Sequence, residues 1–200
     1  MTTHESAHLQ PGSKPSSAAD INRRRRLALQ SLGTGALVLG AAPLLSACSP
    51  GAISPAAFNT IDNALQTLEK LRNHPLHTDG AWDLAHVLHH VAQSIEYSLH
   101  GFPALKPAWF RSTIGPMAFA IFSARGQMSH SLDEAIPGAP AIPQAQPLPP
   151  AIDHLVAALQ SFAKHSGPLM PHFAYGELDK PEYTRAHLMH LANHWKEVIA

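Results

Sequence analysis

Three histidines near the end of the chain are spaced so that a helix would place their imidazoles on one side. His187, His190 and His194 follow one another at intervals of three and four residues. At 100° per residue they fall within about 60° of one another. Imidazoles at these spacings can bind the same metal ion, so the stripe predicts a metal site. A solvated or hydrogen-bonded histidine face is the alternative interpretation.

A metal held by imidazoles of one helix needs a further ligand from a facing element, and a second cluster offers candidates. His86, His89 and His90 lie in a segment with apolar residues at helical spacing. Periodicity does not choose among them, because it leaves His89 and His90 on opposite flanks of the apolar stripe. Seven other histidines follow no common pattern and are predicted to be surface or capping groups: His74, His77, His100, His130, His154, His165 and His172.

The composition favours metal or proton chemistry and argues against nucleic-acid binding. All 15 histidines except His4 and His8 lie beyond Cys48, and imidazole both titrates near neutral pH and ligates metals. Residues 1–47 hold five of the 14 basic residues and two of the 14 acidic ones, so the remainder carries a formal charge of −3. Without a basic patch, contact with phosphates has no electrostatic support.

Residues 1–47 are predicted to be an export signal. Arg23 to Arg26 form a cationic start, and the residues from Leu27 to Ala47 carry no charge. This order is typical of a signal peptide. The run is long enough to span a bilayer, but its many small residues and Pro43 favour a cleaved signal helix over a permanent anchor.

The end of this run resembles the lipobox of bacterial lipoproteins. The residues are Leu45-Ser46-Ala47-Cys48, and in such proteins the thiol is lipidated and the chain is cut just before it. The alternative makes Cys48, the only cysteine, an ordinary small apolar residue. The resemblance implies export to the cell envelope and a lipid anchor in a membrane that faces the periplasm. Ser49 gives no strong signal for inner-membrane retention, which favours the outer membrane.

The arginines also resemble a twin-arginine translocation signal. Arg24 and Arg25 are followed by one spacer and then Leu27. Ala28 departs from the pattern, which prefers a larger apolar residue there, and four arginines would equally serve general secretion. A twin-arginine route would let the domain fold, and acquire a metal, before export. The route stays open.

The exported part is predicted to be a tether over residues 48–56 and an all-α domain over residues 57–200. No alternating strand pattern of useful length is present. Apolar residues at helical spacing predict helices over residues 57–71, 82–99, 109–130, 151–164 and 182–198. The third of these is interrupted at Gly115-Pro116 and again at Gly126. Six prolines between Ala135 and Pro150 predict an extended crossover, because proline fixes φ and removes amide donors.

The second helical segment carries a family resemblance. Trp82 to Pro103, with His90-Val91-Ala92-Gln93-Ser94-Ile95-Glu96-Tyr97-Ser98 inside it, resembles the DinB/YfiT-like superfamily and, within it, the family called domain of unknown function 1569. The similarity runs from about Ala57 to the C-terminus and includes Ile136-Pro137-Gly138. It implies a DinB-like four-helix bundle. It also implies one histidine on the second helix and two on the last that bind zinc, nickel or a related divalent ion.

By that resemblance His90 is the ligand on the second helix. The superfamily's closing pattern of two histidines separated by three residues is met by His190 and His194 alone. His187 would need its partner at Leu191, or it pairs with His190 at three-residue spacing. His187 therefore stays an alternative ligand.

Three imidazole ligands leave a coordination position open, as in catalytic sites. Because some members of the superfamily are metal-dependent thiol transferases or isomerases, the first hypothesis is a metal-dependent hydrolase or thiol transferase of an unidentified small molecule. The alternatives are a non-enzymatic envelope lipoprotein that binds metal or a partner, and a bundle without metal. Self-association into a homodimer is left open. Gln93 and Glu96 are interpreted as surface groups or as groups that orient an imidazole, and Trp82, Trp109 and Trp195 as core residues.

Overall fold

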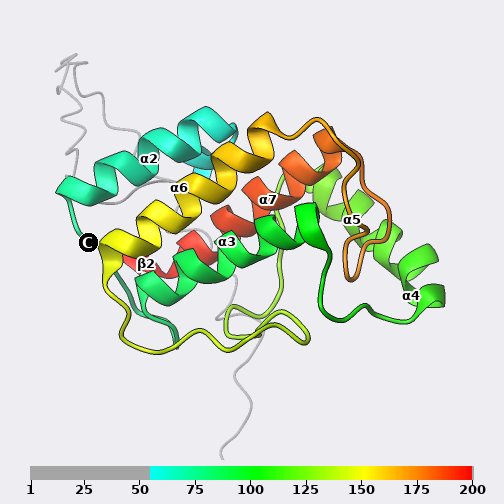
Figure 1. Cartoon of the computed structure of the whole chain (residues 1–200), viewed down its shortest axis with the longest axis horizontal. Helices are drawn as coiled ribbons and strands as arrows, with labels where there is room; N and C mark the ends of the chain where they lie inside the picture. Colours follow the sequence, from blue (N-terminus) through cyan, green and yellow to red (C-terminus); the bar gives the residue numbers. More distant parts are fainter. Residues whose placement is uncertain (1–54, 200) are drawn as a thin grey trace, which may run out of the picture. The chain divides into compact units, whose positions relative to one another are not determined.

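The computed structural model describes residues 55–199, so the predicted signal and most of the predicted tether lie outside the described part. Helices dominate (Figure 1). The elements are η1 (Pro55–Phe58), α2 (Ile61–Asn73), β1 (His77–Thr78), α3 (Leu84–His100), α4 (Ala108–Ser112), α5 (Ile114–Arg125), α6 (Leu148–Lys164), α7 (Lys180–His194), η2 (Trp195–Glu197) and β2 (Val198–Ile199). None of the helices within these residues is long and apolar enough to cross a membrane.

The two helices that carry the predicted ligands, α3 and α7, begin at strong local signals, and α3 also ends at one. Asp83 caps α3 by accepting a hydrogen bond from the His86 amide at 2.7 Å. Beyond the last residue of α3, Gly101 takes φ 104, which glycine adopts without strain. Asp179 and Glu182 form a reciprocal capping box at the start of α7. Local sequence therefore fixes where the site helices begin.

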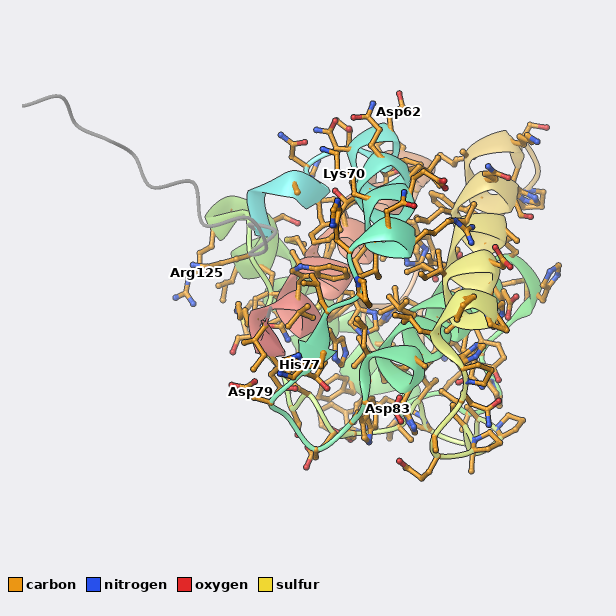
Figure 2. All side chains as sticks on the ribbon, turned by 90° about the vertical axis from the view of Figure 1, so that its left-hand side faces the viewer. Asp62, Lys70, His77, Asp79, Asp83 and Arg125 are labelled. Atoms are coloured by element: carbon orange, nitrogen blue, oxygen red, sulfur yellow. The ribbon has the colours of Figure 1, made fainter. Side chains whose placement is uncertain are left out.

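One hydrophobic core joins α2, α3, α6 and α7, and the most extensive packing is between α3 and α6 (Figure 1). The largest apolar side chains that it buries completely are Leu68, Leu71, Leu88, Ile95, Ile152, Leu155, Leu159, Phe162, Tyr183, Leu191 and Trp195. Each such side chain stabilises the fold by roughly 1.5–3 kcal/mol relative to its exposed state. The polar face of α2, which includes Asp62 and Lys70, points away from this core (Figure 2).

A smaller cluster attaches α5 and the loop after it to α7. Phe119 and Met128 pack against Ala186 and Met189. This contact holds the segment that leads to His130 against the helix of the predicted ligands.

The all-α prediction missed a short sheet. β1 and β2 pair antiparallel, with His77 opposite Ile199 and Thr78 opposite Val198. Strands of two residues are too short to show the alternation that identifies a strand in a sequence. The pair ties the segment between α2 and α3 to the end of the described chain.

The predicted interrupted helix over residues 109–130 is confirmed in part: the break at Gly126 is present, but the first break lies at Thr113 rather than at Gly115-Pro116, and no helix continues to His130. The chain forms α4 and α5 instead, separated at Thr113, and α5 ends before Gly126 at φ 65. Pro116 lies in the first turn of α5, where its missing amide breaks no helical hydrogen bond. The burial predicted for Trp109 on this segment is also wrong, since the residue is 62% exposed.

Other helix boundaries also differ from the prediction, and those of α6 and α7 differ for identifiable reasons. Helix α6 begins at Leu148 rather than at residue 151, because Pro149 and Pro150 occupy a first turn that needs no amide donors. The proline-rich crossover is therefore shorter than predicted. Helix α7 covers residues 180–194 rather than 182–198, since the chain passes into η2 and β2.

We expect Leu155→Ala to lower the free energy of unfolding by about 2–5 kcal/mol, because it leaves a cavity where α6 contributes to the core. Leu105→Ala is the matched control, at a position that is 46% exposed, and should change it by less than about 0.5 kcal/mol. Urea unfolding followed by circular dichroism measures both. Equal effects of the two substitutions would contradict this core assignment.

Candidate metal centre

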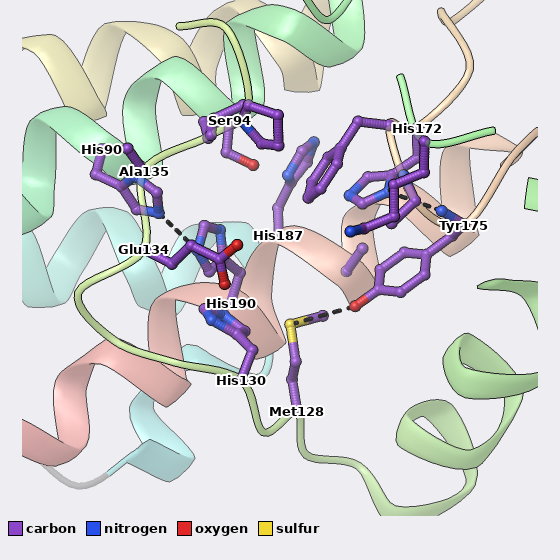
Figure 3. Close-up of a pocket in the computed structure, with 16 residues that line it drawn as sticks. His90, Ser94, Met128, His130, Glu134, Ala135, His172, Tyr175, His187 and His190 are labelled. Carbon is purple, nitrogen blue, oxygen red and sulfur yellow. Dashed lines mark hydrogen bonds between the residues drawn. The ribbon is translucent and has the colours of Figure 1, made fainter. Parts of the chain in front are cut away.

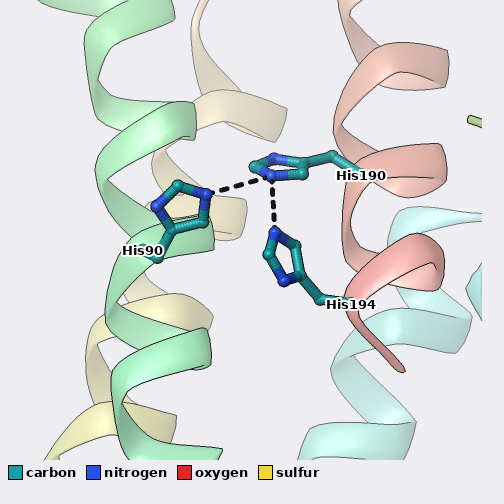
Figure 4. A group of neighbouring side chains, drawn as sticks. All are labelled: His90, His190 and His194. Carbon is teal, nitrogen blue, oxygen red and sulfur yellow. Dashed lines mark hydrogen bonds between the residues drawn. The ribbon is translucent and has the colours of Figure 1, made fainter. Parts of the chain in front are cut away.

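Three imidazoles from two helices converge between α3 and α7. His90 comes from α3, and His190 and His194 lie one turn apart on α7 (Figure 4). Nε2 of His190 is 3.2 Å from Nε2 of His90 and 3.1 Å from Nε2 of His194. One nitrogen of each residue lies within 4.8 Å of the other two. We call these three residues the trio.

Two of the three nitrogen–nitrogen separations in the trio fit a shared ion. Zinc–imidazole bonds of about 2.0–2.1 Å place ligand nitrogens about 3.3–3.4 Å apart in a tetrahedron and about 2.9 Å apart in an octahedron. The two short distances in the trio lie between these values. Nε2 of His190 carries either one proton or one lone pair, so it makes one ordinary hydrogen bond. That bond can go to Nε2 of His90 or to Nε2 of His194, but not to both. A cation accepts a lone pair from all three.

Burial keeps the imidazoles of the trio in their neutral form. His90 and His194 are buried and His190 is partly buried. Burial, and after it the neighbouring imidazoles, lower the pKa of His90 and of His194 to about 3 and hold the pKa of His190 well below its ordinary value. Neutral imidazole is the form that ligates metals. At neutral pH the trio therefore offers lone pairs rather than positive charge.

Trp82 packs against one side of the trio. Its ring centroid lies 4.9 Å from that of His90 and 6.0 Å from that of His194. The ring planes of Trp82 and His194 are nearly parallel, with an angle of 9° between them. Nδ1 of His194 is buried and has no hydrogen-bond partner among the described residues. A metal-ligating histidine usually donates this second N–H to an oxygen. At Nδ1, aromatic packing therefore stands where a hydrogen bond would otherwise orient the ring of His194.

Two members of the trio, His90 and His190, also line a cavity of about 210 Å³ (Figure 3). Apolar side chains cover part of its wall, and its charged lining groups are Lys106 and Glu134, both exposed. Further lining residues include Ser94, Met128, His130, Ile136, His172, Tyr175 and His187. A small molecule in this cavity would lie beside the imidazoles of the trio.

His187, the alternative ligand, is bonded elsewhere. Its Nε2 lies 3.1 Å from Oγ of Ser98. Because that hydroxyl donates to the Ile95 carbonyl at 2.6 Å, it accepts from His187, whose proton is therefore on Nε2. The ring also packs edge-on against Phe162. His187 lines the cavity but is not one of the three converging imidazoles.

The prediction of a surface or capping group is wrong for His172, which is buried, whereas His130 is exposed as predicted but lies beside the trio. The His130 ring lies 5.0 Å from that of His190 and 5.4 Å from that of His194, although His130 is exposed. Its Nδ1 is 2.6 Å from the Ser131 carbonyl and donates to it, which leaves the Nε2 lone pair free in the neutral ring. Both residues lie in loops, where no periodic pattern could reveal them.

His172 is a buried part of the cavity wall. Its Nδ1 accepts hydrogen bonds from the amides of Ala174 and Tyr175, each at 3.1 Å. Its ring stacks on that of Tyr175 with 4.2 Å between centroids. Burial lowers the pKa of His172 to about 3. This histidine is therefore neutral and has a fixed tautomer, with its proton on Nε2.

The two residues interpreted as orienting groups do not contact the trio. Gln93 donates to the Pro140 carbonyl at 3.4 Å. Glu96 accepts from His154 on the side of α3 that faces α6. The structure therefore favours the surface interpretation for Gln93, and it pairs Glu96 with a different histidine.

Stability of the metal-free protein should fall as the pH falls from about 6.5 toward 3. The folded-state pKa values of His90, His172, His187 and His194 are about 3, so the unfolded chain takes up protons first. From pH 7 to pH 5 each buried imidazole would cost up to about 2 kcal/mol. Thermal unfolding at both values, with a chelator present, measures the loss. An unchanged melting temperature would contradict the burial of these groups, and His187→Gln should reduce the dependence on pH.

The comparisons with known proteins identify a family. Searches of curated proteins and of solved structures found no match to the chain. A family model described as "Protein of unknown function (DUF1569)" matches residues 55–200. The match covers both helices of the trio and the cavity loops. The chain therefore belongs to the DUF1569 family.

Proposed function

We propose that this protein binds one divalent metal ion through His90, His190 and His194. The carrying observation is the convergence of three Nε2 atoms, with separations of 3.2 and 3.1 Å at His190. Imidazole ligands suit zinc and nickel. With three ligands from the protein, such an ion keeps a position open and can acidify water or activate a thiolate.

The arrangement of the helices supports a relation to the DinB-like four-helix bundles. Helices α2, α3, α6 and α7 share one core, and α4 and α5 are inserted between the second and third of them in chain order. One trio member lies on the second of these four helices and two lie on the last, as the superfamily resemblance implies. This relation is part of the proposal.

The cavity beside the trio supports an enzyme rather than a structural metal site. Its volume of about 210 Å³ is suited to a small molecule. Lys106 and Glu134 place one charge of each sign in the lining, so they can orient a polar substrate. The free Nε2 of His130 can take a proton from a group bound next to the trio. We propose a metal-dependent hydrolase or thiol transferase.

We expect the untagged protein to carry close to one equivalent of zinc or nickel. Both His90→Ala and His194→Ala should reduce this to near zero, because loss of a ligand should weaken binding by more than the roughly 10–100-fold that loss of an outer group costs. Elemental analysis of the folded variants measures the content.

His187→Gln is the matched control for these ligand variants. It removes a buried histidine of the same helix whose Nε2 bonds Ser98, and it should keep the metal. Full metal content in His90→Ala, or complete loss in a folded His187→Gln protein, would contradict the assignment.

We further propose that the protein is exported and anchored by lipid on Cys48. The support is the order of features in residues 1–48: the arginine cluster, an uncharged run, and Leu45-Ser46-Ala47-Cys48. These residues lie outside the described part of the structure. The metal site would then face the periplasm.

Cys48→Ala should abolish incorporation of a labelled fatty acid when the full chain is made in a bacterium. It should also leave the signal uncleaved, because lipoprotein processing requires the modified thiol. Ser49→Ala is the control and should be labelled like the wild type. Gel fluorography and intact mass measure the two effects. An unlabelled wild-type protein would exclude the lipid anchor.

A further inference from the structure

A second pair of histidines joins α3 to α6, away from the trio. Nδ1 of His89 lies 2.8 Å from Nδ1 of His154, and Nε2 of His154 lies 2.8 Å from a carboxylate oxygen of Glu96. The two ring centroids are 5.1 Å apart. Both histidines are partly exposed. From the sequence alone, His89 has no assigned role and His154 is predicted to be a surface group.

Glu96 fixes the tautomer of His154. A carboxylate only accepts hydrogen bonds, so Nε2 of His154 carries a proton and donates. In neutral His154 the lone pair is then on Nδ1, which faces His89. Without metal, Nδ1–H of His89 donates to that lone pair. The two hydrogen bonds together fix the orientation of the His154 ring, and with it the direction of the Nδ1 lone pair.

We propose that His89 and His154 form a second binding site for a divalent metal ion, with their two Nδ1 atoms as ligands. Their separation of 2.8 Å is close to the roughly 2.9–3.3 Å between neighbouring nitrogens on one ion. A carboxylate that accepts the other N–H of a ligating imidazole is the usual partner in such sites, and Glu96 has this role. His89 provides its lone pair by carrying its proton on Nε2 instead.

The second site is independent of the trio. His89 and His90 are consecutive on α3, so their side chains project about 100° apart. His90 contacts α7, whereas His89 contacts α6. The negative charges of Asp83 and Glu96 act on His89 and favour a cation there. His86 and His154 oppose a cation only when they are protonated.

The expected ion is copper, nickel or zinc, because two imidazoles are its only side-chain ligands. These are the divalent ions that imidazole binds best. Water completes the coordination at this partly exposed place, so the ion should be held more weakly than the one in the trio. A protein with both sites would bind two ions of unequal affinity.

The test is a calorimetric titration with zinc alone. The protein is the untagged full chain, stripped of metal and kept in detergent. The wild type should bind two ions, His190→Ala one, and His190→Ala with His89→Gln none. His100→Gln, an exposed change on the same helix, should leave one ion in the His190→Ala protein. Glu96→Gln should weaken that ion by about 10-fold or more.

Two results would overturn the second site: an ion that survives both His89→Gln and His154→Gln in the His190→Ala protein, or no ion there at all. Long-range proton–nitrogen spectra of the wild type give a second readout that does not depend on variants. The second equivalent of zinc should shift the Nδ1 resonances of His89 and His154, and unshifted resonances would also overturn the proposal. Loss of the first ion alone would count against the trio instead.

Discussion

The candidate site depends on holding three imidazoles out of water between α3 and α7. Burial disfavours the imidazolium, so the nitrogens keep their lone pairs at neutral pH. The arrangement costs stability until a cation or a proton network satisfies those nitrogens. Packing must meet that cost, because Nδ1 of His194 has no hydrogen-bond partner among the described residues. An ion that binds only this arrangement would add its binding free energy to the stability of the fold.

Helix α3 connects the features that bear on function. Its apolar face enters the core shared with α6, which fixes its position along that helix. One flank presents His90 to α7, and the other presents His89 to α6. A shift of this helix would therefore disturb both histidine groups together. Trp82, just before its first turn, packs on His86 as well as on the trio, so the start of the helix is tied to the site.

Sequence reasoning reached the parts of the site that lie on regular helices. The four-residue spacing of His190 and His194 places them one turn apart, but periodicity left His86, His89 and His90 open, and only the family resemblance pointed to His90. The loop residues of the cavity could not be reached, because the path of the chain after Gly126 is set by tertiary contacts such as that of Met128 with α7. The two-residue strands are too short to be predicted from the sequence. The start of α6 could not be predicted either, because prolines in the first turn of a helix look like part of the extended crossover.

The most direct test is a crystal structure of the metal-loaded protein with anomalous data collected at the absorption edge of the bound metal. The account predicts one strong peak about 2.1 Å from Nε2 of His90, His190 and His194, with its open side toward the cavity that Lys106 and Glu134 line. A protein that is folded, exposed to zinc or nickel, and shows no anomalous peak between α3 and α7 would contradict it.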